Sequence, residues 1–222
     1  MKKIFALVLV LILAISVFAA CGGNSNNKDK SGKDEKFEYG KDYIAQNLKG
    51  DYSITYKYSV AGQEDALVIT HTRTSAGVYM SYGGMEMLYI KNGDKYDIYQ
   101  GSSENGFVKV DFMDSVTQEE MESDALYSIA YSFLNIFIHQ YTDNISGLKK
   151  DGSATVAGRD CEKYTFQYSG FGAAVKYTYY IDKVTGVCMK WDYDVAAAGQ
   201  GGSMTFECIE FKTSGVTLPA YK

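Results

Sequence analysis

A short, almost wholly apolar segment constrains this fold more than any other feature of the sequence. Of the 14 residues from 125 to 138, 11 are apolar. The exceptions recur at helical spacing and form one narrow polar stripe with His139: Ser128, Ser132 and Asn135. A helix that crosses a bilayer needs about 20 apolar residues, and Asp143 ends this run early. We therefore expect a helix covered by protein on several sides rather than a membrane span.

The residues before this segment favour a helix start. Thr117 and Glu120 have the spacing of a capping box, in which each side chain bonds the other residue's amide. The acids that follow lie where the helix dipole favours negative charge: Glu119, Glu120, Glu122 and Asp124. The predicted helix therefore runs from Thr117 to Tyr141.

Alternating residues predict that most of the remaining chain is β-structure. In residues 52–60, tyrosines and aliphatic residues occupy every second position, so one strand face is covered and the other is wet. Asn92 and Gly93 predict a tight hairpin, because Asn-Gly readily supplies two positive φ values. Clusters of Gly, Asn and Ser delimit the other expected strands: 66–74, 77–82, 85–91, 95–100, 106–112, 161–168, 174–182, 187–195 and 203–212.

The order of these elements predicts the fold class. Short connections without intervening helices favour antiparallel pairing. A short helix is expected at 41–48, ending at Gly50. The only layer available to cover the apolar helix is the sheet, so we expect an α+β, mostly antiparallel fold. In it a curved sheet or half-open β-barrel wraps around the central helix.

The N-terminus reads as a secretory signal. Residues 4–20 are apolar except for Ser16, and they follow Met1-Lys2-Lys3. The sequence Val17-Phe18-Ala19-Ala20-Cys21 resembles a bacterial lipobox, although Phe18 stands where aliphatic residues are usual. The resemblance implies a signal peptide at 1–20 and acylation of Cys21, for example with palmitate, which then anchors the chain to a membrane. The alternative is an ordinary cleaved signal followed by an incidental cysteine.

Residues 22–36 contain no aromatic or aliphatic side chain and predict a flexible tether spanning roughly 20 Å. The β-rich domain then covers 37–222. Removing residues 1–20 takes away two lysines and no acid, so the net charge changes from −5 to −7. Such a charge is a poor match to a phosphate backbone, and we expect no nucleic-acid partner. The expected location is the extracytoplasmic face of the cell membrane, similar to Gram-positive surface lipoproteins.

Several segments together resemble the LolA, LolB and LprG type of lipoprotein-carrier and lipid-binding fold. They include the first helix, the Tyr-rich strand and the apolar helix, and three further stretches: residues 88–99, 156–164 and 180–186. The resemblance implies a half-open β-barrel whose concave face and helix enclose a site for acyl chains. In contrast to the soluble carriers, Cys21 would tether this chain.

Catalytic and metal-binding motifs are not evident, and we expect neither an enzyme nor a cofactor. His71 and His139 belong to different elements, and the cysteines lack Cys-x-x-Cys spacing. Acids such as Asp192 and Asp194 alternate on a strand and predict a solvated face rather than a calcium site. Three cysteines remain besides Cys21, which permits one disulfide and leaves the pairing open: Cys161, Cys188 and Cys208.

The expected function is non-covalent binding of an apolar or amphiphilic ligand, such as a lipid or acyl chain, between sheet and helix. Met adapts to irregular apolar shapes, and Tyr combines an apolar ring with a polar tip. The candidate ligand-binding residues are Tyr56, Tyr58, Met80, Tyr82, Met87, Tyr89, Phe133, Phe137, Tyr177, Tyr179, Met189, Trp191 and Tyr193. The alternative is a surface module whose core is filled by these side chains and which binds a protein or a cell-wall glycan.

Overall fold

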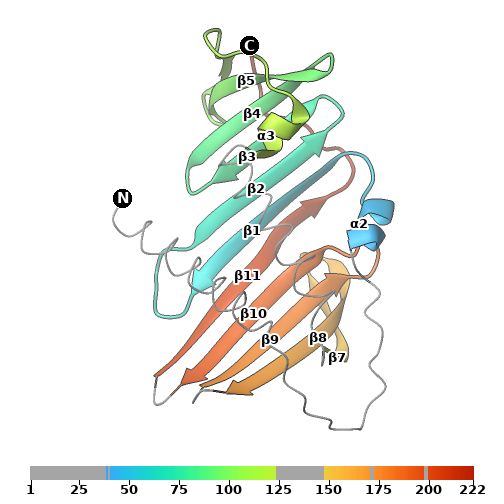
Figure 1. The fold of residues 1–222 in the computed structure, drawn as a ribbon, viewed down its shortest axis with the longest axis vertical. Helices are drawn as coiled ribbons and strands as arrows, with labels where there is room; N and C mark the ends of the chain where they lie inside the picture. Colours follow the sequence, from blue (N-terminus) through green and yellow to red (C-terminus); the bar gives the residue numbers. More distant parts are fainter. Residues whose placement is uncertain (1–38, 40, 124–147, 171–172, 198–199) are drawn as a thin grey trace. The chain divides into compact units, whose positions relative to one another are not determined.

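The chain forms one open antiparallel sheet of 11 strands (Figure 1). The computed structural model describes residues 39, 41–123, 148–170, 173–197 and 200–222. The strand order is β6-β5-β4-β3-β2-β1-β11-β10-β9-β8-β7. Every neighbour in this order is also a neighbour in sequence except the β1–β11 pair, which joins two meanders into one sheet. The predicted mostly antiparallel β class is confirmed.

The bounds of the elements follow the predicted pattern closely. The first meander contains β1 (Tyr52–Val60), β2 (Leu67–Thr74), β3 (Gly77–Tyr82), β4 (Met85–Asn92), β5 (Lys95–Ser102) and β6 (Gly106–Lys109). The second contains β7 (Lys149–Val156), β8 (Arg159–Gly170), β9 (Ala173–Asp182), β10 (Cys188–Ala197) and β11 (Gln200–Lys212). Helix within the described part of the chain is confined to α2 (Lys41–Asn47) and α3 (Gln118–Ser123). Neither of these helices is long enough to cross a membrane.

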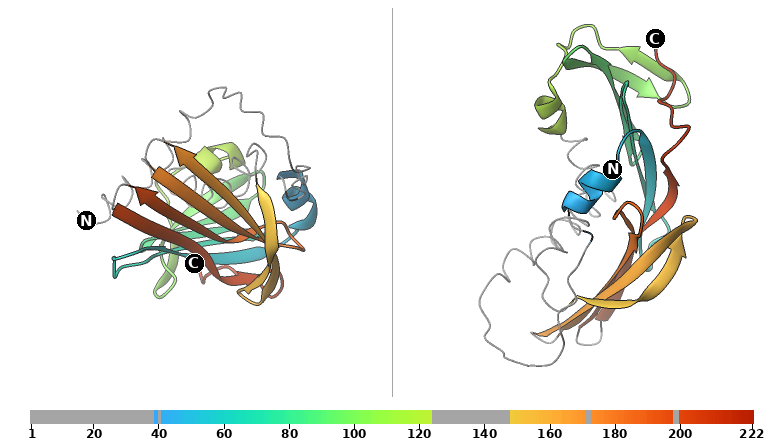
Figure 2. Two further views of the ribbon diagram at one scale, coloured as in Figure 1. Left: turned by 90° about the horizontal axis from the view of Figure 1, so that it is seen from below. Right: turned by 90° about the vertical axis from the view of Figure 1, so that its right-hand side faces the viewer.

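The sheet bends, and α2 and α3 lie on its concave side (Figure 2).

Thr117 and Glu120 form the predicted capping box: the Thr117 amide donates to Glu120 Oε2 at 2.7 Å, and the Glu120 amide donates to Thr117 Oγ1 at 3.2 Å. The predicted helix over 117–141 therefore starts where expected, as α3. Its residues after Ser123 lie outside the described part, so wrapping of the sheet around a central helix stays a prediction.

Two sequence predictions differ from the structure at the strand level. The strand expected over 106–112 ends at Lys109, because the chain turns just beyond it, where the Met113 amide donates to Val110 O at 3.1 Å. An additional strand, β7, was not expected. Its residues are almost all exposed and include three consecutive charged side chains, Lys149, Lys150 and Asp151, so no alternation marks it. β7 is the edge strand opposite β6.

The hairpin predicted at Asn92-Gly93 is present, but its loop is shifted by one residue. Asn92 pairs with Lys95, which leaves Gly93 and Asp94 as the two loop residues. Gly93 has a φ of +63°, whereas Asn92 lies in the strand with negative φ. Glycine in the first loop position matches a II′-type turn rather than the expected I′ turn.

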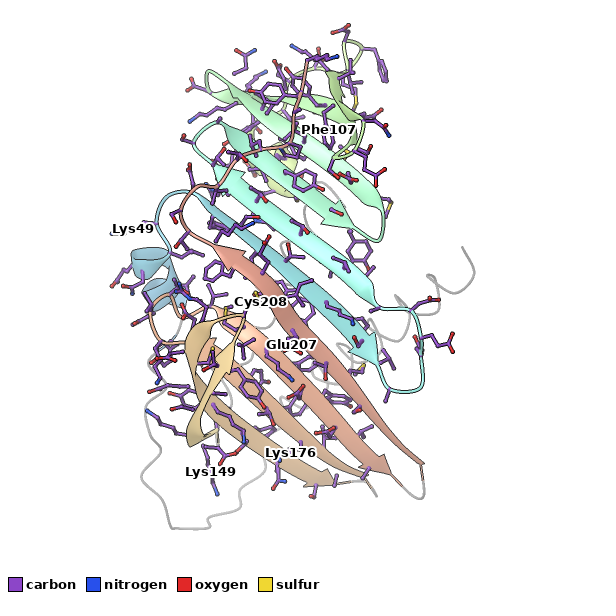
Figure 3. All side chains as sticks on the ribbon, turned by 180° about the vertical axis from the view of Figure 1, so that it is seen from behind. Lys49, Phe107, Lys149, Lys176, Glu207 and Cys208 are labelled. Carbon is purple, nitrogen blue, oxygen red and sulfur yellow. The ribbon has the colours of Figure 1, made fainter. Side chains whose placement is uncertain are left out.

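A small core lies on the convex side of the first meander, opposite to the side on which α3 lies (Figure 2). Tyr79, Leu88, Ile90, Tyr99 and Phe107 are buried there, with Leu218 packed against them. We call residues 213–222 the C-terminal strap. The Phe107 amide donates to Ala220 O at 3.0 Å, and the Lys222 amide donates to Phe107 O at 2.9 Å. Figure 3 shows the strap passing Phe107 at the end of the sheet.

Candidate functional site: the aromatic face

Cross-strand register places most of the predicted ligand-binding residues on one face of the sheet. Residues paired across neighbouring strands point to the same side. Tyr56 and Tyr58 of β1 begin this face, which continues through Ile69 and His71 of β2. We call it the aromatic face. By register it also carries the other predicted residues of four strands: Met80, Tyr82, Met87, Tyr89, Tyr177, Tyr179, Trp191 and Tyr193.

The remaining predicted residues are placed differently. Met189 lies at the β-bulge between Cys188 and Lys190 and is fully buried. Phe133 and Phe137, expected on the helix, lie outside the described residues. The opposite face of the second meander carries charged side chains such as Lys176 and Glu207 (Figure 3). The second meander thus has one aromatic and one charged side, whereas the opposite side of the first meander carries the core around Phe107.

Most side chains of the aromatic face are shielded from solvent. Tyr58 is 1% exposed, Met80 2% and Trp191 7%. Met87 and Tyr193 are only partly buried. Access by a ligand to the central part of this face therefore requires the protein to open, whereas Tyr193 already offers a partly exposed margin.

Five rings of β8, β9 and β10 form a continuous aromatic cluster. Tyr177 is its centre: its ring lies 5.2 Å from the Tyr193 ring, 6.2 Å from Trp191 and 5.9 Å from Phe166, measured between centroids. Tyr179 stacks beside Tyr177 at 6.4 Å. Such rings supply a large apolar surface with polar hydroxyl tips, which suits an apolar or amphiphilic ligand.

Two tyrosine hydroxyls connect β1 to the second meander. Tyr56 donates to the carbonyl oxygen of Cys188 at 2.8 Å, and its ring stacks on Phe206 at 4.3 Å. The Tyr58 hydroxyl lies 3.0 Å from Met204 Sδ. Burial raises the pKa of Tyr56 well above its usual value, and burial together with the nearby Tyr82 raises the pKa of Tyr58 to about 12. Both phenols therefore stay neutral at physiological pH and tie the two meanders together.

The three cysteines are free, buried thiols. Burial is the main cause that raises the pKa of Cys161 to about 11 and those of Cys188 and Cys208 to about 12. Thiolates are the reactive form, so these side chains are poor nucleophiles. Within the described ranges, no three side chains of the metal-binding types gather into a site.

His71 and Arg73 also face this side of the sheet, and sequence reasoning did not assign them to the site. His71 pairs with Ile54 and Met80, and Arg73 pairs with Tyr52 and Val78. The signal was present in the alternation of β2, where Leu67, Ile69, His71 and Arg73 occupy every second position. Both polar residues thus lie within an apolar surface, and His71 stacks on Tyr52 at 5.6 Å.

Burial, and then the charge of Arg73, lower the pKa of His71 from 6.5 to about 3. The unfolded chain therefore binds more protons than the folded chain between these values. Stability is full above pH 6.5 and falls as the pH drops toward 3, with an expected loss of about 2 kcal/mol by pH 5. Urea unfolding of the native chain and of His71→Gln, each at a pH above 6.5 and at pH 5, measures this loss of stability. An equal loss in the native chain and in His71→Gln would contradict its attribution to His71.

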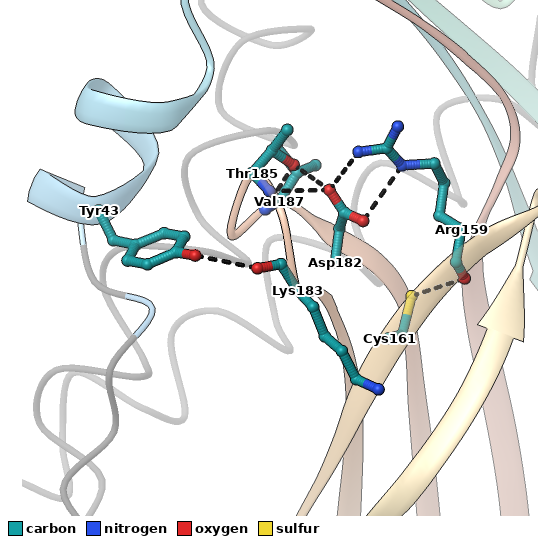
Figure 4. Close-up of polar contacts among 7 residues, drawn as sticks. All are labelled: Tyr43, Arg159, Cys161, Asp182, Lys183, Thr185 and Val187. Atoms are coloured by element: carbon teal, nitrogen blue, oxygen red, sulfur yellow. Dashed lines mark hydrogen bonds and ion pairs between the residues drawn. The ribbon is translucent and has the colours of Figure 1, made fainter.

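The β9–β10 hairpin holds α2 against the sheet through a buried polar cluster (Figure 4). Asp182, 1% exposed, accepts Arg159 Nε at 3.1 Å and Arg159 Nη2 at 2.7 Å. It also accepts the Thr185 amide at 2.9 Å. The Tyr43 hydroxyl of α2 donates to Lys183 O at 2.9 Å. A Cβ at Gly186, where φ is +76°, would lie 2.7 Å from the Tyr43 ring, so the close approach requires glycine.

Comparison with known proteins yields similarity of fold. No protein-family model and no curated protein matches the chain. A chain of the Pseudomonas aeruginosa MucA/MucB complex is 14% identical, with a TM-score of 0.39, and the match covers 80% of this chain and 58% of that one. MucB in complex with MucA(peri) is 13% identical, with a TM-score of 0.36 and coverage of 82% and 58%. This chain thus spans 58% of the length of each.

A DUF1329 family protein from Desulfovibrio piger is 10% identical, with a TM-score of 0.26, and the match covers 79% of this chain and 92% of that one. These similarities concern the fold alone.

Proposed function

We propose that this chain is a membrane-anchored extracytoplasmic lipoprotein that binds an apolar or amphiphilic ligand on the aromatic face. The observation that carries the proposal is the aromatic face itself: one side of a single sheet presents Tyr, Trp and Met side chains from both meanders. The resemblance of sequence segments to the LolA, LolB and LprG type motivates the same function.

Anchoring is proposed from the lipobox-like sequence at Cys21. Two acyl chains at about 0.8 kcal/mol per buried methylene would hold the chain stably at a membrane surface. The Lys-, Asn- and Gly-rich tether would then keep the sheet close to the lipid without fixing its orientation.

Trp191 provides a direct test of ligand binding. It is the single tryptophan of the chain and belongs to the aromatic cluster. Bromine quenches indole fluorescence at short range, so dibrominated stearate should quench Trp191 saturably, whereas unbrominated stearate should displace it and restore the signal. The measurement is a fluorescence titration of the full chain below the micellar concentration of each ligand.

Two tyrosine variants control for the location of binding. Tyr193 lies on the aromatic face and Tyr180 on the opposite face, and both are partly buried. Tyr193→Ala should weaken binding roughly two- to tenfold through loss of one aromatic contact. Tyr180→Ala should leave the affinity unchanged. Equal effects of both variants would place the ligand elsewhere.

The burial of the aromatic face favours a second candidate function. On this face Tyr58 and Tyr89 are 1% exposed and Met80 and Tyr179 are 2% exposed, as expected of a filled core. In that case the chain is a surface module that binds a protein or a cell-wall glycan. Absence of any saturable quenching of Trp191 would support this second function over lipid binding.

A further inference from the structure

One row of the aromatic face contains a single charge. Register pairs Arg73 with Tyr52 on one side and Val78 on the other, and the row continues to Tyr89 and Ile98. All four of these neighbours are less than 9% exposed, whereas Arg73 is partly buried. A guanidinium group therefore lies at the margin of an apolar surface that spans five strands.

Arg73 is not neutralised by the described part of the protein. Its side chain forms no hydrogen bond or ion pair with any residue described in the structure. The second arginine of the chain differs, because Arg159 forms a bidentate ion pair with the buried Asp182. Cationic lysines such as Lys109 and Lys163 likewise have carboxylate partners. Of the two arginines, Arg73 is therefore the one without an anion among the described residues.

The surroundings of Arg73 favour one kind of partner. Removing a cation from water without a counter-ion is unfavourable, so an anion brought by a ligand would offset that loss. The planar guanidinium group matches the two oxygens of a carboxylate or phosphate. His71, two residues away on the same face, stays neutral above about pH 3 and adds no second charge. The flanking side chains are apolar and suit the hydrocarbon part of the same molecule.

We propose that Arg73 binds the anionic headgroup of an amphiphile, a carboxylate or a phosphate, whose hydrocarbon chain lies along the aromatic face. The assignment rests on the proposed ligand binding and narrows it from apolar ligands in general to anionic amphiphiles. Arg73 is then the residue that determines specificity for the headgroup, and the Tyr and Met side chains contact the hydrocarbon part of the ligand.

Three dibrominated ligands that share an 18-carbon chain test this assignment by the quenching of Trp191. Their headgroups are an alcohol, a carboxylate and a phosphate. In the native full chain, the better of the two anions should bind roughly 10- to 100-fold more tightly than the alcohol. Which anion binds better distinguishes a fatty acid from a phosphate-bearing lipid. Arg73→Gln should remove most of this preference. Arg73→Lys should retain part of it, because lysine keeps the positive charge but lacks the paired N–H donors of the guanidinium group.

The matched control is Lys57→Gln, which removes the same charge from the exposed, opposite face of β1. It should leave the ratio of anion to alcohol affinity unchanged. Equal affinity of the native chain for all three ligands would overturn the assignment of Arg73 while leaving ligand binding intact. An equal loss of alcohol and anion binding in Arg73→Gln would overturn it too, because the arginine would then be structural. Absence of quenching by all three ligands would refute the proposed binding itself.

Discussion

An Asp182→Ala chain is expected to lose about 3–5 kcal/mol of its free energy of unfolding. The substitution leaves the Arg159 guanidinium group, whose side chain is 25% exposed, without its carboxylate. It also removes the acceptor of the Thr185 amide, which shapes the β9–β10 turn against which α2 packs. Urea unfolding monitored by circular dichroism at neutral pH measures the loss.

An exposed ion pair offers the control for Asp182. Glu210 and Lys212 are 52% and 53% exposed and pair at 2.7 Å, so Glu210→Ala should cost less than about 1 kcal/mol. Burial alone would raise the pKa of Asp182, but the hydrogen bonds from Arg159 and Thr185 outweigh it and lower the pKa. The stability from this carboxylate is therefore present above its unfolded pKa and is lost as the pH falls through the lower, folded value. A loss in Asp182→Ala as small as that in Glu210→Ala would show that the cluster is not structural.

The second large effect is expected at Phe107, which is 1% exposed in the core beneath the C-terminal strap. Phe107→Ala should lower the free energy of unfolding by about 3–5 kcal/mol, because it opens a cavity among Tyr79, Leu88 and Leu218. The strap should also loosen, since its ring contact between Tyr221 and Tyr99, with centroids 5.3 Å apart, borders the same core. Urea unfolding gives the first quantity, and hydrogen exchange of the Lys222 amide gives the second.

Phe112 is a control of the same residue type, five positions along the chain. Its side chain is 87% exposed, so Phe112→Ala should change stability by no more than about 0.5 kcal/mol. The sequence prediction placed both phenylalanines in one strand over 106–112, whereas β6 ends at Lys109 and Phe112 lies beyond it. Similar losses for Phe107→Ala and Phe112→Ala would contradict the packing of the strap.

Local patterns predicted the parts of the fold that depend on local physics. The alternation around Tyr56 gave β1 and its buried face, and the Thr117–Glu120 spacing gave the start of α3. Register needs the turn geometry of the folded chain, and for this reason the loop at Gly93 was misplaced by one residue. The edge strand β7 has no buried face, so hydrophobic periodicity could not reveal it.

The candidate site was predictable only residue by residue. Tyr177 and Trp191 were recognised as face residues from their own strands, but that Arg73 shares this face follows from pairing across several strands. The strap that buries Phe107 depends on contacts between segments far apart in sequence, which no periodic pattern encodes. Phe133 and Phe137 stay predictions.

The seam between β1 and β11 has a consequence for the order of folding. Every other strand pair joins neighbours in sequence, whereas Tyr58 and Met204 meet across 146 residues. The two meanders can thus form early from local pairings, and the rate should be set by the closure that brings β1 to β11. Until then each half exposes an unpaired edge strand, the Tyr-rich β1 in one half and β11 with Phe206 and Phe211 in the other, which makes this interval the period of greatest exposure to aggregation.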